Sequence, residues 1–203
     1  MIKKNKLNNN KDLDKVLSLL NTILNKDEFS LAFSDEIMQI TLKKPKILSV
    51  LKLLKENESF KFNQLIDITA VDYPNKKNRF EMIYIFLSVE KNLRLIVKFL
   101  LEEDEEVDSL TQLFPSANWY EREVWDLFGI AFNNHPDLRR LLTDYGFIGH
   151  PLRKDFPLSG NVEVKYDVSS KKVVYEPVKL TQSFREFDFE SPWEGEEIEK
   201  NND

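Results

Sequence analysis

Three strand-like runs follow one another along residues 64–71, 79–89 and 92–100, with only short turn-forming segments between them. This arrangement restricts the possible folds more than any other feature of the chain. Apolar side chains alternate along the runs, as is typical of strands with one buried face. The middle run is apolar on both faces, which predicts a central strand covered from each side. The alternating positions are Ile66, Ile68 and Ala70 in the first run and Leu93, Leu95, Val97 and Phe99 in the third.

Two helices and one further strand are predicted before these runs. Residues 12–25 carry apolar side chains at helical spacing, and residues 36–42 alternate as a strand does. Pro45 suits the first turn of a second helix, along which apolar residues recur up to Leu54. The order helix, strand, helix, three strands predicts an α+β fold of two layers, α-β-α-β(3). The apolar positions upstream are Leu13, Val16, Leu17, Leu20, Ile23 and Leu24, then Met38, Ile40 and Leu42, then Ile47, Val50, Leu51 and Leu54.

The second half of the chain begins with a helix and then loses its periodicity. Pro115 opens a helical stretch that continues to Phe128. Within it Arg122 and Asp126 stand four residues apart, which predicts an ion pair on the helix surface. From Gly129 onward no regular spacing remains, so a functional loop, a wrap around a partner or disorder is expected. The predicted divisions are an N-terminal tail at 1–11, the α+β domain at 12–108, an interface helix with an extended partner-binding segment at 109–193, and an acidic tail at 194–203.

Composition excludes several classes of function. The 203-residue chain has a formal charge of −6, and nucleic acid is not expected as a partner because phosphates are bound by basic surfaces. It has no cysteine, which excludes disulfides, thiol nucleophiles and cysteine-held metal clusters. No apolar run approaches the roughly 20 residues that cross a bilayer, so membrane association is expected only through partners. The frequent use of Lys, Asn, Ile and Phe points to AT-rich coding DNA, as in an organelle or a low-GC bacterial genome.

A metal-dependent enzyme using Glu121, Asp126 and His135 is one alternative. Ligand pairs on a helix usually stand three or four residues apart. Of the acidic residues here only Glu123 and Asp126 meet that spacing, and neither partner is a histidine. Ion-paired carboxylates are therefore the favoured interpretation of this group.

Nucleophilic catalysis and phosphate binding are also weakly supported. Ser159, His150 and Asp155 contain the residue types of a hydrolase triad, but no nucleophile elbow surrounds the serine. The sequence has no Gly-rich phosphate loop. Basic residues that could grip a phosphate, namely Arg139, Arg140, Arg153 and Lys154, are better explained as partners of carboxylates on a protein surface.

The segment after the helix has the composition of a protein interface. It contains both histidines of the chain and is rich in Arg, aromatic residues, Gly and Pro, and interfaces are enriched in aromatic residues and Arg. Gly and Pro set the turns that let an extended chain follow a partner's surface. The residues predicted to form this interface are Glu121, Arg122, Asp126, Phe128, Gly129, His135, Pro136, Arg139, Arg140, Tyr145, Gly146, Phe147, Gly149, His150, Pro151, Arg153, Lys154 and Asp155.

Residues 110–194 resemble one family closely. The run ERE at 121–123, then Asp126, His135, Arg139 and the apolar pair at 141–142 resemble the motif of the thirty-kilodalton subunit of respiratory complex I, NADH:ubiquinone oxidoreductase. The later runs VVYEPVKLTQSFREFDF and SPWE are similar to its mitochondrial and α-proteobacterial branch, whose organelle-encoded form is subunit 9. Upstream of residue 110 only the order of elements is similar.

The resemblance implies a core subunit of the peripheral arm with no catalytic residue or cofactor of its own. FMN, the iron–sulfur clusters and ubiquinone would lie in neighbouring subunits. The family's C-terminal segment clamps the forty-nine-kilodalton quinone-site subunit, and a mitochondrial subunit would sit on the matrix side of the inner membrane. The related subunit of a membrane-bound hydrogenase-type complex is the alternative within the same superfamily. In the free chain, residues 12–100 are expected to resist proteases, and residues from 129 onward to be cut until the partner binds.

Overall fold

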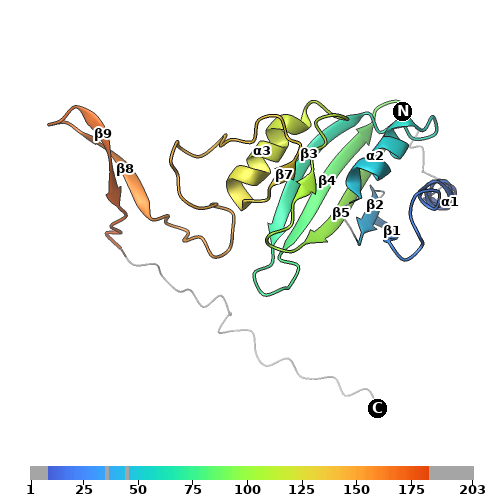
Figure 1. Cartoon of the computed structure of the whole chain (residues 1–203), viewed down its shortest axis with the longest axis horizontal. Coiled ribbons are helices and arrows are strands. Elements are labelled where there is room, and N and C mark those ends of the chain that lie inside the picture. Colours follow the sequence, from blue (N-terminus) through green and yellow to red (C-terminus); the bar gives the residue numbers. More distant parts are fainter. Residues whose placement is uncertain (1–8, 35–36, 44–45, 183–203) are drawn as a thin grey trace, which may run out of the picture. The chain divides into compact units, whose positions relative to one another are not determined.

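The computed structural model describes residues 9–34, 37–43 and 46–182. The chain divides into two compact units, residues 1–158 and residues 159–203, which are described separately. The first unit is a five-stranded sheet with helices on one face (Figure 1). Its elements are α1 (Asn9–Leu20), β1 (Phe29–Ser34), β2 (Ile37–Leu42), α2 (Ile47–Glu56), β3 (Gln64–Asp72), β4 (Phe80–Ser88), β5 (Leu93–Leu101), β6 (Val107–Asp108), α3 (Ala117–Phe128) and β7 (Phe132–Asn133).

The sheet has the strand order β1-β2-β5-β4-β3. Strands β2 and β5 are parallel and the other neighbours are antiparallel. Alternate residues of β4 and β5 are fully buried, and the register places both buried sets on one face, as with Tyr84 opposite Val97. The buried faces of α1, α2 and α3 belong to the same apolar cluster as these residues. The predicted α+β fold is therefore confirmed, with one core between a sheet and a layer of helices.

Several expectations need correction. Strand β1 was not predicted, and it adds a fifth strand beside β2. A β-bulge between Leu65 and Asp67 shifts the pairing of β3, so Leu65 is buried where Ile66 was expected to be. The second face of β4 is only half-buried, because the helices that the structure describes cover the other face. Helix α1 ends at Leu20, earlier than the expected residue 25.

The polypeptide after α3 remains part of the first unit up to residue 158. Strand β7 pairs in parallel with β6, and the following segment packs along α3 without further helices or strands. The expected boundary at residue 108 does not coincide with this division. The reason lies in buried polar contacts that join residues 139–155 to α3 and to β3, which a periodicity pattern does not detect.

The second unit contains a β-hairpin of β8 (Val162–Asp167) and β9 (Lys172–Pro177). The turn is held by Asp167, whose carboxylate accepts hydrogen bonds from the backbone N–H groups of Ser169 and Ser170. Regular structure was not predicted here, although Val162, Val164 and Tyr166 alternate with polar residues. The acidic tail at 194–203 lies outside the described residues. Among the described helices, none has the length and apolar character that a membrane crossing requires.

Candidate functional site

Asp126, near the end of α3, is the centre of a buried polar network. Its Oδ2 atom accepts hydrogen bonds from the backbone N–H groups of Leu141 (3.0 Å), Leu142 (2.7 Å) and Thr143 (3.0 Å). Its Oδ1 atom accepts bonds from the Thr143 hydroxyl at 2.5 Å and from Nη1 of Arg140 at 2.7 Å. Burial alone would raise the pKa of this carboxyl, but the hydrogen bonds outweigh it and hold the pKa well below its usual range. The ionised carboxylate thus anchors the loop to the helix.

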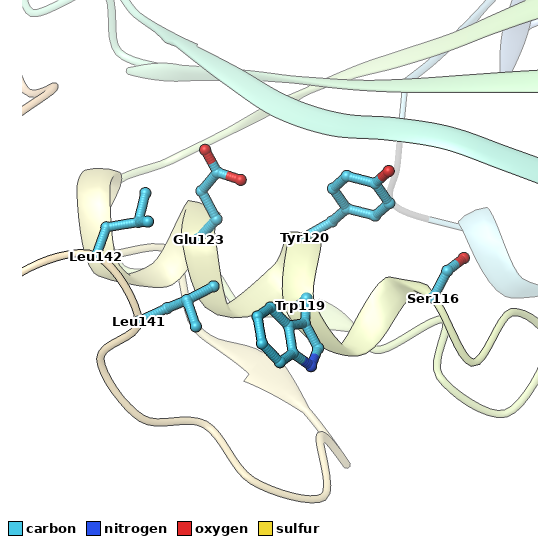
Figure 2. Close-up of a pocket in the computed structure, with 6 residues that line it drawn as sticks. All are labelled: Ser116, Trp119, Tyr120, Glu123, Leu141 and Leu142. Carbon is cyan, nitrogen blue, oxygen red and sulfur yellow. The ribbon is translucent and has the colours of Figure 1, made fainter.

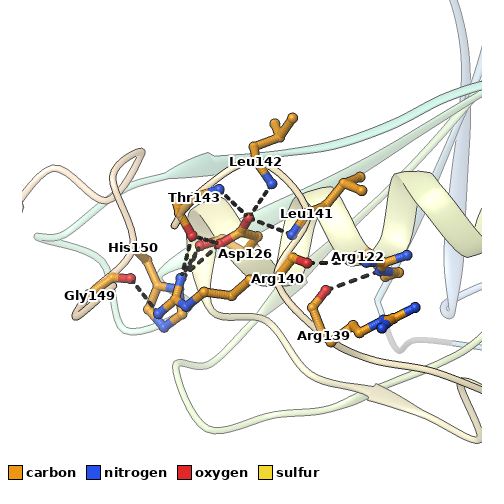
Figure 3. A network of polar contacts seen from close by, with 9 residues as sticks. All are labelled: Arg122, Asp126, Arg139, Arg140, Leu141, Leu142, Thr143, Gly149 and His150. Atoms are coloured by element: carbon orange, nitrogen blue, oxygen red, sulfur yellow. Dashed lines mark hydrogen bonds and ion pairs between the residues drawn. The ribbon is translucent and has the colours of Figure 1, made fainter. Parts of the chain in front are cut away.

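Arg140 extends the network to the next part of the loop (Figure 3). Its Nη2 donates to the carbonyl of Gly149 at 3.1 Å, and its Nη1 also reaches the Thr143 hydroxyl at 3.1 Å. Nδ1 of His150 lies 2.9 Å from the backbone carbonyl of Asp126. The Nη1 and Nη2 groups of Arg140 therefore donate to acceptors of the same chain. Arg140 thus pairs with a carboxylate of its own chain, and its predicted contact with a partner carboxylate stays a prediction.

Arg122 does not form the expected surface ion pair with Asp126. Its side chain is buried and donates from Nε to the carbonyl of Arg139 (3.0 Å) and from Nη2 to the carbonyl of Arg140 (3.1 Å). Spacing of four residues brings two side chains to the same side of a helix, but it does not decide which acceptors they meet. Here the Arg122 guanidinium binds backbone carbonyls of the loop instead of the Asp126 carboxylate. The Arg139 side chain is 69% exposed, and among the described residues its ion pair is with Asp137.

The end of α3 requires glycine. Gly129 has φ of +80° and closes the helix through a hydrogen bond to the carbonyl of Trp125. A Cβ atom here would lie 2.7 Å from the His150 ring and 2.8 Å from Nη2 of Arg153. Arg153 donates to the carbonyl of Phe128 at 2.6 Å and pairs with Glu103 at 2.8 Å. The loop and the helix end are therefore in direct contact.

A second anchor joins the loop to the sheet. Asp72 at the end of β3 accepts a hydrogen bond from the backbone N–H of Lys154 at 2.7 Å. It is also paired with Arg79, whose hydrogen bonds are the main cause of its lowered pKa. The Arg79 guanidinium reaches Asp155 at 2.9 Å as well. Asp155 and Lys154 are exposed apart from these contacts.

Glu121 forms a separate buried site on α3. Its carboxylate accepts bonds from the Ser109 hydroxyl and from the backbone N–H of Leu110, both at 2.6 Å. Burial is the largest influence and raises the pKa of Glu121 to about 7 despite those bonds. The buried His135 ring accepts from the backbone N–H of Asp137 at Nδ1, so its Nε2 carries the proton and donates to the carbonyl of Asn118.

The residues of the catalytic alternatives have other partners. Both oxygens of Glu121 and both of Asp126 already accept hydrogen bonds. The residues that the structure describes contain no group of three or more His, Asp or Glu side chains arranged to hold a metal ion. In the triple of Ser159, His150 and Asp155 the serine hydroxyl is bonded to the carbonyl of Gly160, and the other two side chains belong to the networks above.

The predicted interface residues thus separate into three groups by burial. Glu121, Arg122, Asp126, Phe128 and the His135 side chain are buried in the first unit. Gly129, Arg140, Phe147, Gly149, His150, Pro151 and Arg153 are half-buried around α3, with the Phe147 ring stacked on Phe156 at 5.8 Å. The exposed group comprises Pro136, Arg139, Tyr145, Gly146, Lys154 and Asp155.

Most of the large exposed apolar side chains were not predicted. On the first unit Trp119, Leu142, Ile148 and Leu158 are exposed, in addition to Tyr145 of the predicted set, which is 99% exposed. On the hairpin, the register places three exposed pairs on one face: Val162 with Pro177, Val164 with Tyr175, and Tyr166 with Val173. Alternation in both strands was the signal that could have identified this face. Large exposed apolar surfaces are typical of sites where a protein contacts another molecule.

Comparison with known proteins identifies the family. A sequence model described as the 30 Kd subunit of respiratory-chain NADH dehydrogenase matches residues 40–162. The chain belongs to this family. The C subunit of NADH-quinone oxidoreductase from Paramagnetospirillum magneticum is 54% identical over 158 residues, which cover 78% of this chain and 79% of the relative. The subunit 9 of NADH-ubiquinone oxidoreductase from Reclinomonas americana is 52% identical, over 84% of this chain and 83% of its own length.

A solved structure resembles this member of the thirty-kilodalton family in fold. It belongs to the membrane-bound sulfane sulfur reductase, an archaeal respiratory membrane complex. The TM-score is 0.61 at 26% identity, and the match covers 73% of this chain and 86% of that one. The resemblance noted from the motif of residues 121–142 is confirmed by these comparisons. Two charged residues of the motif, Arg122 and Asp126, bind the loop from α3 within this chain.

Proposed function

We propose that this chain is a non-catalytic subunit of an NADH:quinone oxidoreductase of the complex I type, and that it docks on and stabilises the forty-nine-kilodalton quinone-site subunit. The family membership and the names of its relatives support the assignment to that complex. Docking is supported by one feature above all: a two-stranded hairpin with exposed apolar residues along one face. A hairpin of this kind is marginally stable in water and gains stability by packing against another surface.

The surface proposed for docking lies in the C-terminal part of the chain. Most of the large exposed apolar side chains found in the described residues occur between Leu142 and Leu180. On the first unit, the exposed residues of the predicted set belong to the proposed surface, namely Pro136, Arg139, Tyr145, Gly146, Lys154 and Asp155, because interfaces combine apolar and polar side chains. The buried motif residues Arg122 and Asp126 support this surface indirectly, because they hold the loop in place.

The chemistry of electron transfer is assigned to other subunits in this proposal. FMN, the iron–sulfur clusters and ubiquinone would be bound by neighbours, and this chain would support electron transfer by keeping the quinone-site subunit in position. The carboxylates of Glu121 and Asp126 are engaged by the chain's own donors, which supports a structural role for them. By analogy with the Reclinomonas americana subunit 9, we place the complex at the mitochondrial inner membrane, on the matrix side, with an organellar gene.

A second candidate is the related subunit of a membrane-bound hydrogenase-type complex. The fold resemblance to a chain of the archaeal sulfane sulfur reductase favours it. The identity to that chain is 26%, compared with 54% to the relative from Paramagnetospirillum magneticum. The complex I assignment is therefore preferred.

Affinity purification tests the proposal. The full chain, tagged at one end and produced in its own host, would be isolated from membranes solubilised with a mild detergent, and the accompanying proteins would be identified by mass spectrometry. We expect the quinone-site subunit in equal amount, together with NADH:quinone reductase activity. Recovery of a hydrogenase-type catalytic subunit would favour the second candidate, and recovery of the chain alone would exclude both.

A further inference from the structure

An open groove of about 620 Å³ runs along α3. Four of its six lining residues come from one side of the helix, spaced as positions 116, 119, 120 and 123, and the other two come from the loop (Figure 2). The six residues are Ser116, Trp119, Tyr120, Glu123, Leu141 and Leu142. Two aromatic rings and two leucines thus surround a single carboxylate.

The carboxylate of Glu123 differs from the other two acidic groups on α3. Glu121 and Asp126 each accept several hydrogen bonds from the chain. Within the residues that the structure describes, Glu123 has no ion pair and no hydrogen-bond donor, although its side chain is half-buried. A carboxylate partly removed from water is stabilised by a cation placed beside it. Figure 2 places it between Tyr120 and Leu142 along the groove.

We propose that this groove receives an arginine side chain of a neighbouring subunit, flanked by apolar residues. The planar guanidinium can form two parallel hydrogen bonds to Glu123 and lie against an aromatic ring. Arginine fits better than lysine because it is less strongly hydrated and stacks on aromatic faces. Leu141, Leu142 and Trp119 would cover the flanking apolar residues.

The inference rests on the proposed function, because it names the chemistry of one contact in the proposed docking surface. It also connects two features of the chain. Leu141 and Leu142 line the groove, and their backbone N–H groups are the ones held by Asp126. The buried network therefore shapes the wall of the groove, and a disturbed network would change the groove as well as the fold.

Site-specific photo-crosslinking in the intact complex tests the occupant. One variant carries p-benzoylphenylalanine in place of Trp119, which is 66% exposed and tolerates a large aromatic substitute. A second carries it in place of Val164 on the hairpin. After irradiation of solubilised complex, crosslinked peptides are sequenced by mass spectrometry. We expect position 119 to crosslink to a segment of another subunit that contains arginine between apolar residues.

The outcomes separate the inference from the proposed function. A crosslink from position 164 to another subunit, with none from position 119 or with one to a segment lacking arginine, overturns the inference and leaves the docking proposal standing. A crosslink between two copies of this chain at position 119 also overturns it. Absence of crosslinks to any other subunit from both positions contradicts both proposals.

Charge variants provide an independent readout. Glu123→Gln is expected to speed dissociation of the subunit from the purified complex by about tenfold, and Glu123→Arg by more, because a buried partner guanidinium is left unpaired or repelled. Glu106→Gln, which removes the same charge from an exposed position, is the matched control and should leave the rate unchanged. Equal rates for Glu123→Gln and Glu106→Gln, with both proteins folded by circular dichroism, would refute the arginine contact.

Discussion

At the scale of single residues, the Asp126 carboxylate holds the loop to α3 through several hydrogen bonds at once. Five hydrogen bonds from three consecutive backbone N–H groups, a hydroxyl and a guanidinium converge on it. Its pKa is lowered in the folded state. The stability that follows from this shift is present above the pKa of the unfolded chain, and it is lost as the pH falls below that value.

Replacing this carboxylate by an amide tests the anchor. Asp126→Asn keeps the shape of the side chain but turns an NH₂ group toward donors, which leaves several buried N–H groups unpaired. We expect a loss of about 3–5 kcal/mol in the free energy of unfolding at neutral pH, measured by urea denaturation. Asp137→Asn, in an exposed pair with Arg139, should change it by less than about 1 kcal/mol. A similar small effect at both positions would show that the network contributes little.

Glu121 predicts an unusual pH dependence. Its pKa in the folded chain is raised to about 7, so between its unfolded pKa and pH 7 the folded state binds more protons than the unfolded state. The free energy of unfolding should therefore fall as the pH rises through this window. Glu121→Gln, which stays neutral, should remove that slope and be the more stable protein at pH 8. Parallel urea curves of both proteins at pH 5 and pH 8 decide this, and an unchanged slope would contradict it.

Two glycines with nearly equal φ angles allow the cost of backbone strain to be distinguished from the cost of steric crowding. Gly129 and Gly146 have φ of +80° and +79°, but only the first has atoms where a Cβ would lie. Both Gly→Ala variants should lose about 1–2 kcal/mol from the left-handed conformation. Gly129→Ala should lose more, because the His150 ring and Arg153 must move. Equal losses of thermal stability would mean that the helix end and the loop are not in tight contact.

At the scale of elements, periodicity predicted the helices and strands of the core, except β1, and it did not predict the packing that polar contacts decide. The burial of Met38, Ile40 and Leu42 followed from alternation and is confirmed. Strand β1 was missed although its six-residue run FSLAFS alternates, with Phe29, Leu31 and Phe33 at every second position. The packing of residues 139–155 on α3 was missed because it depends on acceptors such as Asp126 and on backbone carbonyls, which have no periodic signal.

The structure also moves the expected limit of protease resistance. From the loss of periodicity, cleavage of the free chain was expected from residue 129 onward. The buried anchors at Asp126 and Asp72 hold the chain as far as Asp155, so the first cuts should instead fall after Leu158, around the hairpin. Limited trypsin digestion followed by mass spectrometry would locate them, at sites such as Lys165, Lys171 and Lys172. Early cuts at Arg139 or Arg153 would contradict the anchoring.

At the scale of the whole molecule, the chain combines an α+β unit that has its own apolar core with a hairpin that exposes apolar side chains. The family could be inferred from the motif around Asp126, because the residues that hold the loop are also the ones that define the motif. The role of each residue could not be inferred from the sequence. The structure shows that Glu121 and Arg122 are buried whereas Arg139 is exposed, and the motif does not indicate this difference. In this account the motif preserves the shape of the subunit, and apolar side chains make the contact.

Assembly of the complex with altered hairpin faces tests this account most directly. The double variant Val164→Thr and Tyr175→Thr changes one cross-strand pair on the apolar face, whereas Lys165→Thr and Val174→Thr changes the neighbouring pair on the other face. Threonine retains the preference for strand structure in both. Native gel electrophoresis of solubilised membranes would measure the amount of assembled complex, alongside its NADH:quinone reductase activity. We expect the first variant to lose assembly and activity in parallel and the second to retain both. Full assembly and activity in the first variant would contradict docking through the hairpin.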